Sequence, residues 1–140
     1  MALAVFRPPA RSPAAVAPPR PDIAWTVLVA DDDADMRLYL ARCLHGMGAH
    51  RILEAADGRQ ALHLARALLP DLIISDVVMP GLDGEALGDA LKSDVQTAKI
   101  PFLLISGEPS PPRGGDGFLP KPFNATRLRT EVMRLLRGPP

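Results

Sequence analysis

The feature that most constrains the fold is a set of short apolar runs, each of which is followed directly by a charged or polar residue. The runs Thr26–Ala30, Leu72–Ser75 and Pro101–Ile105 have the length of strands and show no alternation of polar and apolar side chains. Strands without alternation are expected where both faces of a sheet are covered, as in parallel sheets. Parallel strands in turn require crossover connections, which are usually helices. The runs therefore predict an α/β fold.

Apolar residues recur at helical spacing between these runs. Helices are expected from Met36 to Met47 with Gly48 after it, from Asp57-Gly58 to Leu68 before Pro70, from Glu85 to Lys92, and from the N-cap Asn124 through Leu136. Shorter strands are expected at Ile52–Ala55 and Gly117–Leu119. Strands that alternate with helices predict a doubly wound, five-stranded parallel sheet with helices on both faces.

The N-terminal segment differs from this pattern, because residues 1–24 hold six of the 16 prolines and little that could be buried. We expect a disordered, proline-rich tail there and one domain over residues 25–138. The formal net charge of zero argues against attraction to nucleic acid, and no apolar run is long enough to cross a membrane. The single cysteine allows no internal disulfide and suits a cytoplasmic location.

Polar residues gather where the expected strands end. The acidic triplet Asp31–Asp33 follows the first strand, Asp76 follows the third, and Ser106 and Lys121 follow the fourth and fifth. Ligands of open α/β sheets bind beyond the carboxyl ends of the strands. Clustered carboxylates repel one another unless a cation shares them, and oxygen ligands favour Mg²⁺. An aspartate beside Mg²⁺ and a lysine can act as a nucleophile, so the site predicts phosphoryl transfer onto a carboxylate.

Four segments then resemble a known family. VLVADDDADMR, LIISDVVMPGLDG, LLIS and KPF, in this order, resemble the receiver domain of response regulators in two-component signalling, which is CheY-like. The resemblance covers residues 26 to about 137. It implies a flavodoxin-like strand order 2-1-3-4-5 and a signalling domain whose only reactions are its own phosphorylation and dephosphorylation.

The resemblance also implies a metal site and a phosphoacceptor. Asp31 and Asp32 match the acidic pair that binds Mg²⁺, and Asp76 matches the phosphorylated aspartate, which is also a metal ligand. Val78 would offer its backbone carbonyl to the metal. Asp33 is instead expected to cap the first helix.

Further roles follow from the same resemblance. Ser106 matches the switch hydroxyl, and Lys121 matches the phosphate-binding lysine. Pro122 matches a proline that is usually cis. Phe118 falls on the aromatic switch position, where plain core packing is an equal alternative.

Partner docking is expected on the outer side of the first helix. Ala34, Arg37, Leu38 and Ala41 lie on or near that side, with Pro122 close to the same site. The resemblance implies that this face docks a histidine kinase or a histidine phosphotransfer protein. An ordinary imperfect helix surface is the alternative.

The segment between the last two strands departs from the family. Relatives have a fourth helix there, whereas Gly107–Gly117 is an eleven-residue stretch rich in glycine and proline. It can reach back across the sheet, because eleven extended residues span roughly 35 Å. We expect a loop that is mobile and orders on phosphorylation, and a protein that stays monomeric because the usual dimerisation helix is missing.

Two other functions remain open from the residues alone. Asp31-x-Asp33 after a strand also resembles the first motif of haloacid-dehalogenase-type phosphatases, and a phosphate-independent docking module is a further alternative. Because little follows Gly138, we expect a stand-alone receiver that signals by a conformational change or relays the phosphate.

Overall fold

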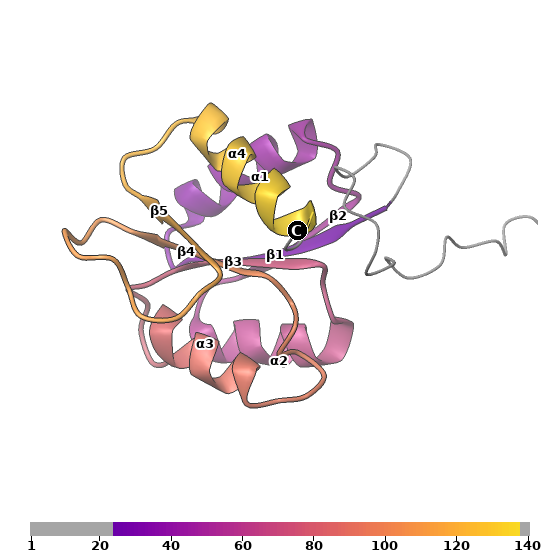
Figure 1. The fold of residues 1–140 in the computed structure, drawn as a ribbon, viewed down its shortest axis with the longest axis vertical. Coiled ribbons are helices and arrows are strands. Elements are labelled where there is room, and N and C mark those ends of the chain that lie inside the picture. Colours follow the sequence, from indigo (N-terminus) through magenta and orange to yellow (C-terminus); the bar gives the residue numbers. More distant parts are fainter. Residues whose placement is uncertain (1–23, 138–140) are drawn as a thin grey trace, which may run out of the picture.

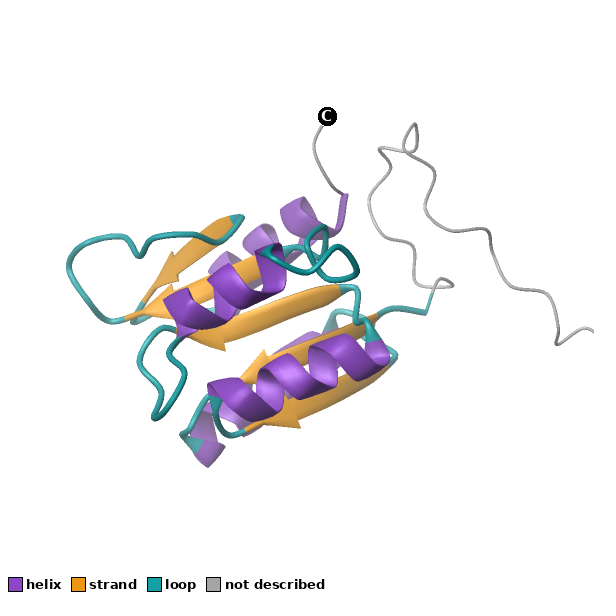
Figure 2. Cartoon of the chain, turned by 90° about the horizontal axis from the view of Figure 1, so that it is seen from below, coloured by secondary structure: helices purple, strands orange, loops and turns teal. Residues whose placement is uncertain are grey.

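The computed structural model of the chain describes residues 24–137 and contains a five-stranded parallel sheet of order β2-β1-β3-β4-β5 (Figure 1). The strands are β1 (Thr26–Ala30), β2 (Arg51–Ala55), β3 (Leu72–Asp76), β4 (Phe102–Ser106) and β5 (Gly117–Pro120). This is the predicted fold class and strand order. Since every neighbouring pair is parallel, the carboxyl ends of all five strands share one edge of the sheet (Figure 2).

Four helices cover the two faces of the sheet, α1 and α4 on one and α2 and α3 on the other (Figure 1). Their bounds are α1 (Ala34–Gly46), α2 (Gly58–Leu68), α3 (Gly84–Lys92) and α4 (Ala125–Arg137). Residues 107–116, between β4 and β5, are all described and contain no helix. The prediction that a loop takes the place of a helix between these two strands is therefore confirmed.

Strand β4 shows how a continuous apolar run serves both layers. Leu103 and Ile105 pack into the core under α1 and α4, whereas Phe102 and Leu104 pack into the core under α2 and α3. All four side chains are at least 99% buried. Because both faces are covered, no polar residue interrupts the run.

Polar side chains fix the starts of the helices. The carboxylates of Asp33, Asp57 and Asp83 accept backbone N–H groups in the first turns of α1, α2 and α3, and Asn124 does the same for α4. These caps satisfy N–H groups that have no partner within the helix. The predicted element ends agree with the observed ones to within one or two residues.

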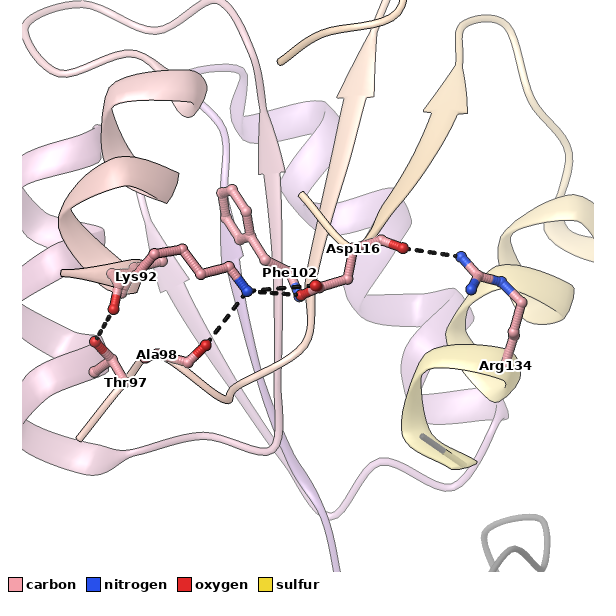
Figure 3. A network of polar contacts seen from close by, with 7 residues as sticks. Lys92, Thr97, Ala98, Phe102, Asp116 and Arg134 are labelled. Carbon is pink, nitrogen blue, oxygen red and sulfur yellow. Dashed lines mark hydrogen bonds and ion pairs between the residues drawn. The ribbon is translucent and has the colours of Figure 1, made fainter. Parts of the chain in front are cut away.

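The β4–β5 crossover is tied down at its second half. The Asp116 carboxylate accepts the N–H of Phe102 at 2.9 Å and pairs with Lys92 Nζ at 3.2 Å, and Arg134 Nη2 donates to the Asp116 carbonyl at 3.2 Å (Figure 3). Arg113 donates its backbone N–H to Glu85 and pairs with another α3 carboxylate. The loop is thus fastened to α3, β4 and α4 without a helix of its own.

The chain enters the sheet through Trp25, which lies directly before β1. Its side chain is buried against the α1–α4 core, and its carbonyl accepts the N–H of His50 at 2.9 Å. The expected N-terminal tail lies outside the described residues apart from Ala24, and so does Gly138. Among residues 24–137, no helix has the length and apolar character that a membrane span requires.

Candidate metal and phosphoacceptor site

Three aspartates meet at the carboxyl edge of the sheet. Asp31 follows β1 and Asp76 ends β3, and these strands are adjacent, with Ala30 beside Ser75. One carboxylate oxygen each of Asp31, Asp32 and Asp76 lies within 4.8 Å of the others. Asp31 and Asp76 are buried, and Asp32 is exposed. The structure therefore brings together the three carboxylates that the sequence suggested as metal ligands.

The turn that carries the first two aspartates is fixed from several sides. The N–H of Asp31 donates to the Ala55 carbonyl of β2 at 3.0 Å. Asp31 Oδ1 accepts the N–H of Asp33 at 2.9 Å, and the Asp33 carboxylate caps α1 through Asp35, as predicted. Arg37 Nη1 donates to the Asp31 carbonyl at 2.7 Å. The acidic turn is thus held by β2 and by α1.

The electrostatics of the cluster favour a bound cation. Burial raises the pKa of the Asp31 carboxyl, and the nearby charges of Asp76 and Asp32 raise it further. The N–H of Asp33 and the ammonium of Lys121 act in the opposite direction but do not cancel the rise in pKa. A set of carboxylate oxygens with excess negative charge is the donor type that Mg²⁺ takes. These residues therefore fit that ion.

Ser106 ends β4 and Lys121 follows β5, at the same edge of the sheet. Lys121 Nζ is 3.3 Å from Asp76 Oδ2, and the N–H of Lys121 donates to the Ser106 carbonyl at 2.8 Å. Ser106 is buried, and its hydroxyl oxygen accepts the N–H of Glu108 at 2.9 Å. The hydroxyl proton of Ser106 remains available for a further acceptor.

The remaining predicted site residues lie in the loops after β3 and β5 and in β5 itself. Val78 lies in the turn after β3, and its aliphatic side chain has no ligand atom, so only its backbone carbonyl could serve the site. The Lys121-Pro122 peptide is cis, as the resemblance implied. Phe118 is half-buried in β5, a position that leaves both of its predicted roles open.

Close packing also supports the phosphoacceptor turn. A Cβ on Gly84 would lie 2.5 Å from the Asp76 carbonyl oxygen, so only glycine lets the start of α3 approach this closely. The N–H of Gly84 donates to the Val77 carbonyl at 2.8 Å. The start of α3 therefore supports the turn that follows Asp76.

The predicted docking helix is only partly as expected. Ala34 is exposed, Leu38 is 49% exposed and Ala41 is half-buried, so an apolar patch does face outward. Arg37 differs from the expectation, because its side chain is only 19% exposed and pairs with Glu54 at 3.1 Å. It contacts the acidic turn, and its role in docking stays a prediction.

Two contacts near the site were missed by sequence reasoning. One is the bond of Arg37 to the Asp31 carbonyl, and the other is the packing of Tyr39 on Phe123, whose ring centroids are 6.1 Å apart. Neither contact has a local sequence signal. Asp31 and Arg37 lie six residues apart across a turn, and Tyr39 and Phe123 belong to distant parts of the chain.

Comparison with known proteins identifies the family. Residues 27–133 match the response regulator receiver domain. The chain is 35% identical over 120 residues to histidine kinase P4 of Formosa agariphila, covering 81% of this chain and 9% of the kinase. It is 36% identical to response regulator MprA of Mycolicibacterium vanbaalenii, covering 79% of this chain and 50% of that protein. The chain thus spans at most about half the length of these two curated relatives.

A solved structure gives the same result. Chemotaxis protein CheY4 of Vibrio cholerae superimposes with a TM-score of 0.74 at 34% identity, covering 80% of this chain and 98% of that one. The sheet order agrees with this match. The chain belongs to the response regulator receiver domain family.

Proposed function

We propose that the chain accepts a phosphoryl group on Asp76 from a phosphohistidine. It then either signals through the conformational change that follows phosphorylation or transfers the phosphoryl group to another protein. The observation that carries the proposal is the Lys121 ammonium, 3.3 Å from an Asp76 carboxylate that also lies beside Asp31 and Asp32. A nucleophilic carboxylate, a cation for the phosphoryl oxygens and a set of metal ligands are the parts that this reaction needs.

The chemistry follows from the charges of these groups. An Asp76 oxygen attacks the phosphorus, an O–P bond forms, and the N–P bond of the phosphohistidine breaks with its electron pair left on the imidazole, which takes up a proton. Bound Mg²⁺ would neutralise charge on the phosphoryl oxygens and would be held by Asp31, Asp32, Asp76 and the Val78 carbonyl. Lys121 can turn from Asp76 to a phosphoryl oxygen, and the Ser106 hydroxyl can donate to another.

The partner that fits this proposal is a histidine kinase or a histidine phosphotransfer protein. The exposed side of α1, with Ala34, Leu38 and Ala41, lies beside the acidic turn and would receive it, with the exposed Pro122 next to the site. Such a partner also implies a cytoplasmic location. The comparison with the receiver domains of kinases and response regulators supports this choice of partner class.

The test is labelling of the whole chain with a small phosphodonor, such as acetyl phosphate, in the presence of Mg²⁺. We expect an acid-stable, base-labile label in the peptide that contains Asp76, and no label in Asp76→Asn. Asp94→Asn is the matched control, because asparagine can still accept the N–H of Gln96 and the residue lies before β4, at the opposite edge of the sheet.

Two results would contradict the proposal. Label on Asp31, together with turnover of phosphomonoesters, would identify a haloacid-dehalogenase-type phosphatase. If the chain binds a histidine kinase domain with the same affinity in the presence and in the absence of phosphodonor and Mg²⁺, it is a docking module that does not use phosphate.

A further inference from the structure

Arg37 makes two contacts with its guanidinium that connect α1, β2 and the acidic turn. Nη1 donates to the Asp31 carbonyl at 2.7 Å, and Nε pairs with Glu54 Oε1 at 3.1 Å. The Arg37 side chain is 19% exposed, whereas that of Glu54 is 47% exposed. An arginine on the second turn of a surface helix would ordinarily extend into solvent, so this inward orientation requires an explanation.

We propose that Arg37 is a positioning residue for the metal site: it fixes the peptide between Asp31 and Asp32, and Glu54 holds its guanidinium in place. The inference rests on the proposed Mg²⁺ site.

The contact acts on both metal ligands at once. The Asp31 carbonyl belongs to the planar peptide that joins Asp31 to Asp32. Its orientation sets the backbone torsions on the two sides, ψ of Asp31 and φ of Asp32, and therefore the direction in which each carboxylate leaves the chain. The N–H of Asp31 is already held by Ala55, so Arg37 completes the restraint.

Arg37 acts through geometry rather than through charge. Arg37 contacts the main-chain carbonyl of Asp31 rather than its carboxylate, and its own charge is paired with that of Glu54. The two mechanisms predict opposite signs. Removal of a nearby cation would tighten Mg²⁺ binding, whereas loss of a restraint on the ligands would weaken it.

The geometry also predicts that a lysine at this position could not replace the arginine. Guanidinium nitrogens form a rigid fork that can serve the Asp31 carbonyl and Glu54 together. A lysine has a single nitrogen on a flexible stem and cannot hold both partners in this arrangement. Arg37→Lys therefore keeps the charge and loses the restraint.

The experiment measures the Mg²⁺ dissociation constant of the whole chain by titration calorimetry. We expect Arg37→Ala to raise it about tenfold, the lower end of the effect of removing a group that orients metal ligands. Arg37→Lys should raise it severalfold, and Glu54→Gln, which keeps an acceptor for Nε, should raise it less. Arg42→Ala is the matched control, because it removes the same charge from an exposed position on α1 and should leave the constant within about twofold.

A second measurement separates positioning from a general folding defect. Phosphorylation by acetyl phosphate, which needs no docking partner, should show a higher Mg²⁺ requirement in Arg37→Ala and a nearly normal rate at saturating Mg²⁺. A damaged fold would instead lower the rate at every Mg²⁺ concentration. If Arg37→Ala does not fold, Arg37→Lys carries the same comparison.

The outcomes distinguish this inference from the function on which it rests. If the unsubstituted chain binds no Mg²⁺, the proposed function fails. If it binds Mg²⁺ and Arg37→Ala or Arg37→Lys binds equally well or more tightly, the positioning role is wrong and the metal site stands. A lowered rate that saturating Mg²⁺ does not restore also overturns the positioning role.

Discussion

Two lysine–aspartate ion pairs of nearly equal length lie at opposite edges of the sheet. Lys121 and Asp76 are 3.3 Å apart at the carboxyl ends of the strands, and Lys92 and Asp116 are 3.2 Å apart at the amino ends of β4 and β5 (Figure 3). Their surroundings differ. The Asp116 carboxylate also accepts the N–H of Phe102, whereas Asp76 lies among other carboxylates.

The comparison shows that the length of an ion pair does not identify its role. Around Asp116, the protein itself supplies the donors that balance the carboxylate, and the result is a fastening between elements. Around Asp76, one lysine faces three carboxylates, so negative charge is left for a ligand to balance. A structural site and a ligand site thus differ in charge balance.

The largest expected difference is in reactivity. Lys121→Ala should slow phosphorylation by acetyl phosphate about a hundredfold, because a preorganised donor to the developing charge is lost. Lys92→Ala, which also removes one cation from an ion pair, should leave the rate unchanged. Both rates are measured by phosphoprotein gel or mass spectrometry at saturating Mg²⁺. Equal rates in the two variants would show that the two lysines do not differ in function.

The reverse difference is expected in stability. Asp116→Ala should lower the free energy of unfolding by about 1–3 kcal/mol, because the N–H of the buried Phe102 loses its acceptor. The half-exposed Lys92 pair adds at most about 1 kcal/mol. Asp116→Asn keeps an acceptor and should lose less. Urea titrations followed by circular dichroism give these values, and a fully stable Asp116→Ala would refute the fastening role.

The excess negative charge around Asp31 should make the free energy of unfolding depend on pH. Its raised pKa means that the folded state binds the proton more tightly than the unfolded state, whose reference value is 3.8. The unfolding free energy of the metal-free protein therefore falls as pH rises from 3.8 through the folded pKa. Asp31→Asn removes that effect, so it should be the more stable protein near pH 7, and the advantage should shrink below the folded pKa and vanish below the unfolded value of 3.8.

Saturating Mg²⁺ provides the control for this prediction. The ion should stabilise the unsubstituted chain and have little effect on Asp31→Asn, so the order of stability should reverse. Unfolding curves with EDTA and with Mg²⁺ test this directly. An Asp31→Asn protein that is less stable in EDTA at neutral pH would contradict the expected sign.

A smaller effect is expected in the β4–β5 crossover. Gly107–Pro112 contains no anchor comparable to Arg113 and Asp116, and it follows Ser106 directly. We expect phosphorylation to slow amide exchange in this first half, as Ser106 moves toward the phosphoryl group, and to leave Arg113–Asp116 nearly unchanged. Hydrogen exchange measured by mass spectrometry with and without Mg²⁺ and phosphodonor tests this. An unchanged exchange rate in both halves would refute the prediction that the loop orders on phosphorylation.

The smallest expected effect is on assembly. The resemblance to receiver domains implies dimerisation through a fourth helix, which residues 107–116 do not form. The protein should therefore keep the molar mass of a monomer after phosphorylation, as measured by light scattering. A phosphorylation-dependent dimer that Arg113→Ala abolished would show instead that the loop replaces the helix as an interface.

The sequence predicted the parts that depend on local pattern. Continuous runs such as Leu72–Ser75 identified the buried strands, and their ends located Asp31 and Asp76. The sequence could not predict the role of Asp116, because a glycine-rich loop has no periodic pattern from which the contacts of a carboxylate could be inferred. It could not predict the contact of Arg37 with the Asp31 carbonyl for a similar reason, since helical spacing gives the face of a residue but not the direction of a long side chain.

The position of Trp25 has a practical consequence for all these measurements. It is the single tryptophan of the chain and is 4% exposed at the amino end of β1, at the edge of the sheet away from the acidic cluster. Its intrinsic fluorescence should therefore follow global unfolding and remain insensitive to metal or phosphate at the carboxyl edge. The chain thus carries a built-in optical probe of folding that ligand binding does not confound.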